Sequence, residues 1–488
     1  MNLALPASGQ PISSFRLVSA LPTIGKKSVP DPCLLCYPRM VKTHVCGTTG
    51  FEAPRVAGQR RWSHWLVLAV LMTGFGTLMA AAADKPFDPQ AATDTWLNTL
   101  PAADRAKSDA YFEGGYILQV WNLALSLVIA WALLRFQVTV KLRDLAERLT
   151  RIKYVQGVVF VALFILVSTV LNLPSDFYEG FVREHRFGLS NLSVGGWFGE
   201  QVKGLLVGMI FSSLIGSLLY LALRKFQQRW WQMAAVVVPF LLFLVVVLAP
   251  VFVAPLFNTY KGLESAAIRD PILAMARANG VPADNVYEFD ASKQTKRISA
   301  NVSGAWGTIR VSLNDNLLQR CTPAEVQAVM GHELGHYVLN HVYKLVIYQS
   351  LLLAAALAFA NWFYGAASRR WGARWGLRGI DDFAGLPLLT AGLSLFMFCA
   401  TPISNSIIRT TEAEADIFGL NAARQPDGFA STALKLAEYR KLSPGPWEEI
   451  VFYDHPSGRS RILMAMKWKA EHLAEFPLSA PVGSPTGK

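Results

Sequence analysis

The chain has 488 residues, of which 52% are hydrophobic and only 16% are charged. Because soluble domains carry about 25% charged residues, this deficit points to a membrane protein. The net charge of +12 is spread over short loops between apolar runs, which argues against a nucleic-acid-binding patch or tail. Five cysteines, three of them in the first 46 residues, indicate no disulfide framework.

The N-terminal part predicts a leader ahead of the folded protein. Residues 1–62 lack sustained apolar periodicity and are rich in Pro, Gly and Ser, so we expect a disordered leader or an extension from an upstream start codon. Arg60 and Arg61 precede residues 63–83, which combine an apolar run with an alanine-rich end. This pattern is typical of a signal peptide, and the run is also long enough for a first membrane span. Both interpretations stay open.

Six further apolar runs are long enough to cross a bilayer, which takes about 20 helical residues. They predict an N-terminal membrane domain over 84–254 and two more spans over 344–410. Three loops between the runs are basic, and alternating topology puts these loops on one side, the cytoplasmic side by the positive-inside rule. The runs are 115–136, 154–173, 203–223, 231–254, 344–364 and 384–408, and the basic loops are 137–153, 224–229 and 365–382.

The segment 255–343 predicts a small extramembrane domain that contains helices and strands. Residues 261–279 look helical, with a break or restart at Pro271 and a stop at Gly280. Two later segments alternate apolar and polar residues and predict strands joined by a turn. The strand segments are 285–290 and 308–313, and the turn is 303–307.

The helix predicted next carries an H-E-x-x-H motif, formed by His332, Glu333 and His336. Positions four apart share a helix face, so both imidazoles can bind one metal ion. Glu333 lies beside them and can reach a metal-bound water, which is the arrangement of zinc metallopeptidases. The alternative is a short motif that stands on a helix by chance.

The start of this helix is marked by a capping box. Thr322 stands at the N-cap, Pro323 at the first helical position and Glu325 three residues after the cap. We expect the helix to run on into the span that begins near Lys344. The metal site would then lie at the mouth of the membrane domain, where ionisable side chains are costly without a function.

A third metal ligand is expected beyond the last span, because catalytic zinc usually has three protein ligands and a water. The segment 411–470 would hold a third-ligand helix and a C-terminal catalytic segment, followed by a disordered tail over 471–488. Glu412 is the first choice as ligand and Glu414 the second. Asp416, one turn after Glu412, could accept a hydrogen bond from a ligating His. His341 is off the metal face and is interpreted as structural.

Several segments together resemble the type I CAAX prenyl protease family of integral-membrane zinc metallopeptidases, which are gluzincins. They are more distantly similar to HtpX-like heat-shock proteases. The likeness extends from about Tyr111 to Lys469. It rests on residues 173–191, on Ala254-Pro255-Leu256-Phe257-Asn258, on His332-Glu333-x-x-His336, on Arg409-x-x-Glu412-x-x-Ala415-Asp416, and on His455-Pro456 followed by Arg461.

The resemblance implies a mainly α fold: a ring of six or seven spans around a chamber, capped by a small α/β zincin-like catalytic domain. It implies one Zn²⁺ per chain and favours Glu412 over Glu414 as its third ligand. It also implies that His455 and Arg461 line the cleft and assist substrate binding and the transition state. Asp416 would orient a ligating His.

The strand before the zinc helix departs from the family pattern, which is close to Asn-Ala-Tyr-x-x-Gly. This chain has Ser299-Ala300-Asn301-Val302-Ser303-Gly304, so the Asn is displaced. We still expect Ala300 and Asn301 to lie on an edge strand that pairs with an extended peptide substrate.

The sequence therefore predicts a zinc-dependent integral-membrane endopeptidase that acts on peptide or protein substrates, lipidated or not, and binds no nucleic acid. One rival is a bacterial quality-control metalloprotease that acts on unmodified proteins. Another is a transporter or scaffold whose motif is incidental. A multi-pass position in a bacterial inner membrane is expected. Loop charges place the catalytic domain on the non-cytoplasmic side, whereas the family's is generally described as facing the cytosol.

Overall fold

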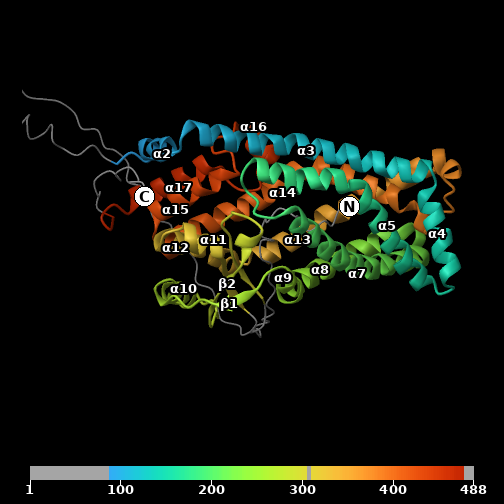
Figure 1. Ribbon diagram of the computed structural model, residues 1–488, viewed down its shortest axis with the longest axis horizontal. Helices are drawn as coiled ribbons and strands as arrows, with labels where there is room; N and C mark the ends of the chain where they lie inside the picture. The colour runs from blue at the N-terminus through green and yellow to red at the C-terminus, as the bar shows by residue number, and fades with distance from the viewer. Residues whose placement is uncertain (1–86, 305–308, 477–488) are drawn as a thin grey trace, which may run out of the picture. The chain divides into compact units, whose positions relative to one another are not determined.

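The computed structural model describes residues 87–304 and 309–476, and from Asp88 onward these form one compact unit (Figure 1). The leader expected over 1–62, the signal peptide or span expected over 63–83, and residues 477–488 of the expected tail lie outside the described residues.

Five helical stretches among the described residues are long and apolar enough to cross a membrane. Large apolar side chains stand on their outer surfaces, as at Ile117 (73% exposed) and Phe240 (70% exposed), which suits a surface in contact with lipid. The predicted count of six or seven slightly exceeds these five stretches. The runs 203–223 and 231–254 lie in one stretch, where a single 3-10 turn links two helices. The stretches are Ala102–Arg135, Lys153–Arg186, Val194–Phe257, His341–Trp375 and Phe383–Ala423.

The helices follow the chain in the order that Figure 1 shows. The first group is α2 (Pro89–Asn98), α3 (Ala102–Arg135), α4 (Val138–Leu149), α5 (Lys153–Phe177), the π-helical turn η1 (Tyr178–Arg183), α6 (Glu184–Arg186), α7 (Val194–Phe226), η2 (Gln227–Arg229), α8 (Trp230–Leu248), η3 (Ala249–Val253) and α9 (Ala254–Phe257). The second group is α10 (Ala266–Ala278), η4 (Ala291–Lys293), α11 (Asp315–Arg320), α12 (Pro323–Val338), α13 (His341–Trp375), η5 (Phe383–Gly385), α14 (Leu386–Ala423), α15 (Pro426–Lys435), η6 (Leu436–Glu438), α16 (Pro446–Phe452) and α17 (Gly458–Glu471).

A cavity of about 940 Å³ lies among α3, α5, α7, α8 and α14. Polar side chains line it within the apolar helices, among them Asn122, Thr169 and Glu200. It extends to the sheet of the catalytic part at Asn301. The expected chamber is therefore present, and it joins the membrane helices to the extramembrane residues.

Within the described part of the chain, four short strands form one sheet in the order β1-β2-β4-β3, with β2 and β4 parallel and the outer pairs antiparallel. Strand β3 is an edge strand, so one row of its backbone groups has no partner strand in the sheet. Val286, Val311 and Leu313 pack beneath the sheet in a core that helices α10 and α12 complete. The strands are β1 (Tyr260–Gly262), β2 (Val286–Phe289), β3 (Ala300–Ser303) and β4 (Arg310–Asn314).

The helix predicted over 261–279 was wrong at its start. Residues Tyr260–Gly262 form β1, because they pair with β2, and the helix α10 begins only at Ala266. It continues through Pro271 without a break and ends before Gly280, whose φ of +69° suits glycine. Residues 305–308 of the predicted turn lie outside the described residues.

The predicted capping box opens α12. Thr322 accepts a hydrogen bond from the Glu325 backbone N–H, and the Glu325 side chain accepts one from the Thr322 N–H at 2.7 Å. The prediction that this helix runs on into the span is wrong. It ends at Val338, and Asn340, in the left-handed conformation at φ 54°, separates it from α13.

The last membrane stretch and the expected third-ligand helix are one helix, α14, which runs without interruption from Leu386 to Ala423. The boundary expected at residue 410 falls inside it. Glu412 therefore lies on the same continuous helix that crosses the membrane domain. In Figure 1, α12, α15 and α17 lie close together at one end of the helix bundle, and α4 lies at the other end.

Candidate active site

Helices α12 and α14 approach each other closely where both carry glycine. A Cβ atom at Gly419 would lie 2.7 Å from the backbone nitrogen of His332, and one at Gly331 would lie 2.9 Å from the Gly419 carbonyl oxygen. Larger residues would push the helices apart at these two positions. This contact fixes the distance between the H-E-x-x-H helix and the helix that carries Glu412.

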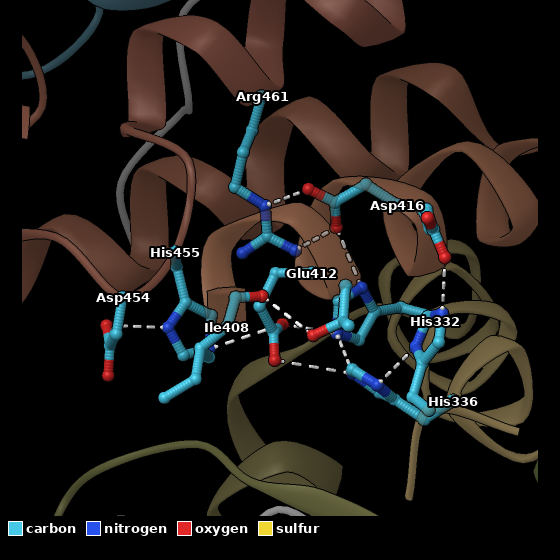
Figure 2. Close-up of polar contacts among 11 residues, drawn as sticks. His332, His336, Ile408, Glu412, Asp416, Asp454, His455 and Arg461 are labelled. Atoms are coloured by element: carbon cyan, nitrogen blue, oxygen red, sulfur yellow. Dashed lines mark hydrogen bonds and ion pairs between the residues drawn. The ribbon is translucent and has the colours of Figure 1, made fainter. Parts of the chain in front are cut away.

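The three expected ligands meet at this helix pair. The Nε2 atoms of His332 and His336 lie 3.1 Å apart, and the Glu412 carboxylate oxygens lie 3.2 Å from His332 Nε2 and 3.6 Å from His336 Nε2 (Figure 2). All three side chains are buried. Within the described residues, no other group of three His, Cys, Asp or Glu side chains brings its ligand atoms this close.

The donor set fits one tetrahedral metal ion. Zinc bonds of about 2.0–2.2 Å place neighbouring ligand atoms roughly 3.3–3.6 Å apart, which is close to the spacing seen here. The buried Oε2 atom of Glu412 accepts no hydrogen bond from the described residues. Such an orphaned oxygen is costly unless a cation binds it.

Asp416 sets the tautomer of His332. The Nδ1–H of His332 donates to Asp416 Oδ1 at 2.7 Å, so Nε2 keeps its lone pair for a metal. Arg461 lies behind this pair and donates from Nε to Asp416 Oδ2 at 2.9 Å. The resemblance implies that Arg461 lines the cleft, and in the structure its guanidinium holds Asp416 in place (Figure 2).

A second chain of hydrogen bonds sets the tautomer of His336. Glu414 accepts from His341 Nε2–H at 3.0 Å, which leaves His341 Nδ1 unprotonated. That atom accepts from His336 Nδ1–H at 3.0 Å, so Nε2 of His336 also keeps its lone pair. Glu414 additionally pairs with Lys344 at 2.5 Å, away from the ligand cluster. From the sequence His341 was interpreted as structural only, because nothing local shows that the turn at Asn340 folds it back onto His336.

We expect His341→Leu to lower zinc affinity about 10- to 100-fold, because His336 loses the acceptor that fixes its ring. His341→Asn should restore most of the affinity, since its Oδ1 can accept the same hydrogen bond. Competition with a chelator measures the affinity, and thermal unfolding of the metal-free variants separates it from stability. Equal zinc affinities for the Leu and Asn variants would contradict this role.

Glu333 and His455 are two further polar side chains close to the ligand cluster. Burial raises the pKa of the Glu333 carboxyl, which suits a group that must accept and return a proton. His455 Nε2 lies 3.3 Å from Glu412 Oε2, and His455 Nδ1–H donates to Asp454 Oδ1 at 2.7 Å. Burial alone would raise the pKa of Asp454, but the charge and hydrogen bond of His455 lower it. Sequence reasoning did not find Asp454.

The two residues expected to bind substrate lie on the edge strand β3. Ala300 is buried in the sheet, so only its backbone could contact a substrate. The partly buried Asn301 lines the large cavity. The strand thus borders the large cavity at Asn301.

Comparison with known families covers most of the chain. The pattern of peptidase family M48 matches residues 263–469, and the pattern of the CAAX prenyl protease N-terminal region, described as five membrane helices, matches residues 91–259. The first match contains the whole ligand cluster, so the H-E-x-x-H motif does not stand on its helix by chance.

Individual proteins with similar sequences support the same family assignment. The uncharacterized metalloprotease YhfN of Bacillus subtilis is 30% identical over 371 residues, which cover 75% of this chain and 87% of that protein. CAAX prenyl protease 1 of Saccharomyces cerevisiae is 29% identical over 239 residues, which cover 48% of this chain and 49% of that protein.

The fold is also that of a solved structure. The crystal structure of S. mikatae Ste24p matches with a TM-score of 0.66 at 22% identity, and the match covers 75% of this chain and 90% of that one. The chain therefore belongs to peptidase family M48, as a multi-pass membrane metallopeptidase of the CAAX prenyl protease type.

Proposed function

We propose that this protein is a zinc endopeptidase that cleaves within the C-terminal C-a-a-X motif of prenylated proteins. The proposal depends on one observation: the buried side chains of His332, His336 and Glu412 bring their donor atoms together in a way that suits a single zinc ion. The substrate is suggested by relatives such as the Saccharomyces cerevisiae and human proteins, which are named CAAX prenyl protease 1 and its homolog.

Zinc held by these three residues would acidify a water toward pKa ~7 and polarise the scissile carbonyl. Glu333 accepts the proton of the attacking water and then delivers it to the leaving amine. His455 faces the cluster and donates a hydrogen bond from Nε2 to the developing oxyanion, where a preorganised donor contributes several kcal/mol. Its ring is held by Asp454 on the opposite nitrogen.

Two further residues position the zinc ligand His332. Asp416 holds His332, and Arg461 holds Asp416. The substrate backbone adds as a strand to β3 at Ala300 and Asn301, which brings the scissile bond alongside the ligand cluster.

The placement in the membrane follows from the length of α14. Glu412 is 26 residues beyond Leu386, which is about 39 Å of helix and exceeds the ~30 Å hydrocarbon core. The Leu386 end meets the basic loops, since Arg143 of α4 pairs with Asp382 at 2.7 Å. We therefore infer that the basic loops face the cytoplasm and that the catalytic end lies on the other side of a bacterial inner membrane.

The decisive substrate experiment compares two C-terminal peptides that differ only in farnesylation of the cysteine. The purified protein, reconstituted in lipid with zinc, should cleave the farnesylated peptide with a kcat/KM at least tenfold above that for the unmodified one. Mass spectrometry of the products measures both rates. Equal rates would favour the rival function, a quality-control protease for unmodified proteins, and no hydrolysis of either would reject the peptidase proposal.

A further inference from the structure

A second cavity, of about 300 Å³, is lined in part by Asp454, and we propose that it binds the free C-terminal carboxylate of the substrate. This inference rests on the proposed function and deepens it, because it assigns the residues that recognise the end of the chain. The cavity reaches the site at Asp454, the neighbour of His455.

The cavity carries an excess of positive charge. Three arginines line it: Arg183, Arg297 and Arg440, brought together from distant parts of the chain. Arg297 pairs with the buried Glu184 at 2.8 Å, and Asp454 is the only acidic residue among the lining residues. Three guanidinium charges thus face two carboxylates, which leaves one positive charge for an incoming anion.

The buried Arg297 also retains a donor for a ligand. Its Nε atom has no hydrogen-bond acceptor among the described residues, although the side chain is only 6% exposed. An unmade hydrogen bond of a buried charged group is costly, and a carboxylate is the acceptor that guanidinium groups match best. This orphaned donor therefore indicates an anion rather than an apolar ligand.

The cavity lies at the right distance for a three-residue tail. Asn405 lines it and precedes Glu412 by seven residues on α14, which is about 10 Å along the helix. Three residues of extended peptide span roughly 10 Å. A scissile bond at the ligand cluster therefore puts the C-terminus of the third following residue in the cavity. Cleavage after the cysteine of a four-residue C-a-a-X motif meets this condition.

The direction in which a substrate peptide would pair with β3 also leads its C-terminus toward this cavity. Strand β3 runs from Ala300 to Ser303, and Arg297 comes three residues before it. A peptide that adds antiparallel, the more stable pairing, points its C-terminus toward the start of β3 and so toward Arg297. Arg297 and Gln119 line both cavities, so a substrate that enters from the large cavity can extend into the small one.

The test compares farnesylated peptides of one sequence that end in a free acid or in an amide. Wild-type protein should prefer the acid by roughly ten- to a hundredfold in kcat/KM, the usual effect of a charge-assisted hydrogen bond. Arg440→Gln should lower this acid-to-amide ratio about tenfold, and Arg440→Lys should keep part of it. Arg269→Gln, which removes a half-buried arginine that pairs with Asp270 on α10, is the matched control and should keep the wild-type ratio.

Binding to Glu333→Gln protein separates this inference from the proposed function. That variant is expected to hold zinc without turnover, so acid and amide peptides can be compared by displacement of a labelled peptide. Tighter binding of the acid, lost in the double variant with Arg440→Gln, supports the carboxylate site even if the natural substrate is another C-terminal peptide. Equal binding, or an equal loss for both peptides in Arg440→Gln, would overturn it.

Discussion

Glu333→Gln is expected to lower kcat by about 10²–10⁴ while the protein keeps one zinc per chain. The amide cannot accept the proton of the attacking water, and it cannot return that proton to the leaving amine. Zinc stays because His332, His336 and Glu412 are untouched. Single-turnover hydrolysis of a farnesylated peptide and metal analysis of the same sample measure both effects.

The control for this variant is Glu325→Gln, the same change in the first turn of the same helix. Glu325 serves the capping box and pairs with Lys435 at 2.7 Å, remote from the cluster. Its loss should cost stability without removing the base. Wild-type turnover by Glu333→Gln would contradict the mechanism, and so would an equal loss of kcat in both variants.

Glu412→Ala is expected to reduce bound zinc from one per chain to nearly none after dialysis, because two imidazoles alone hold the metal weakly. Hydrolysis should be lost with it. Glu414→Ala, two residues away on the same helix, should remain zinc-loaded at saturating metal, since Glu414 contacts His341 and Lys344 rather than the cluster. Metal analysis of the two purified variants tests this pair. Retention of zinc by Glu412→Ala together with its loss from Glu414→Ala would show that the wrong carboxylate was chosen.

The local features of this fold were predictable from the sequence. The capping box at Thr322 and the one-face spacing of His332 and His336 depend on residues within a few positions of one another. Helical periodicity also put Asp416 one turn after Glu412, and so within reach of the same partner helix. The choice of Glu412 over Glu414 needed the family resemblance, because both acids lie on one helix.

The remaining features depend on contacts between distant segments. Residues Tyr260–Gly262 became a strand because β2 offers a partner, and no local pattern shows that partner. His341 supports His336 because the left-handed Asn340 turns the chain back on itself. The small cavity could not be inferred at all, since Arg183, Arg297 and Arg440 are more than 100 residues apart and meet only in the folded protein.

The position of the bound metal decides the central claim. Anomalous diffraction at the zinc edge from crystals of the zinc-loaded protein should show one strong peak about 2.0–2.2 Å from His332 Nε2, His336 Nε2 and an oxygen of Glu412. A peak ligated by Glu414, or zinc bound only at other side chains, would contradict it.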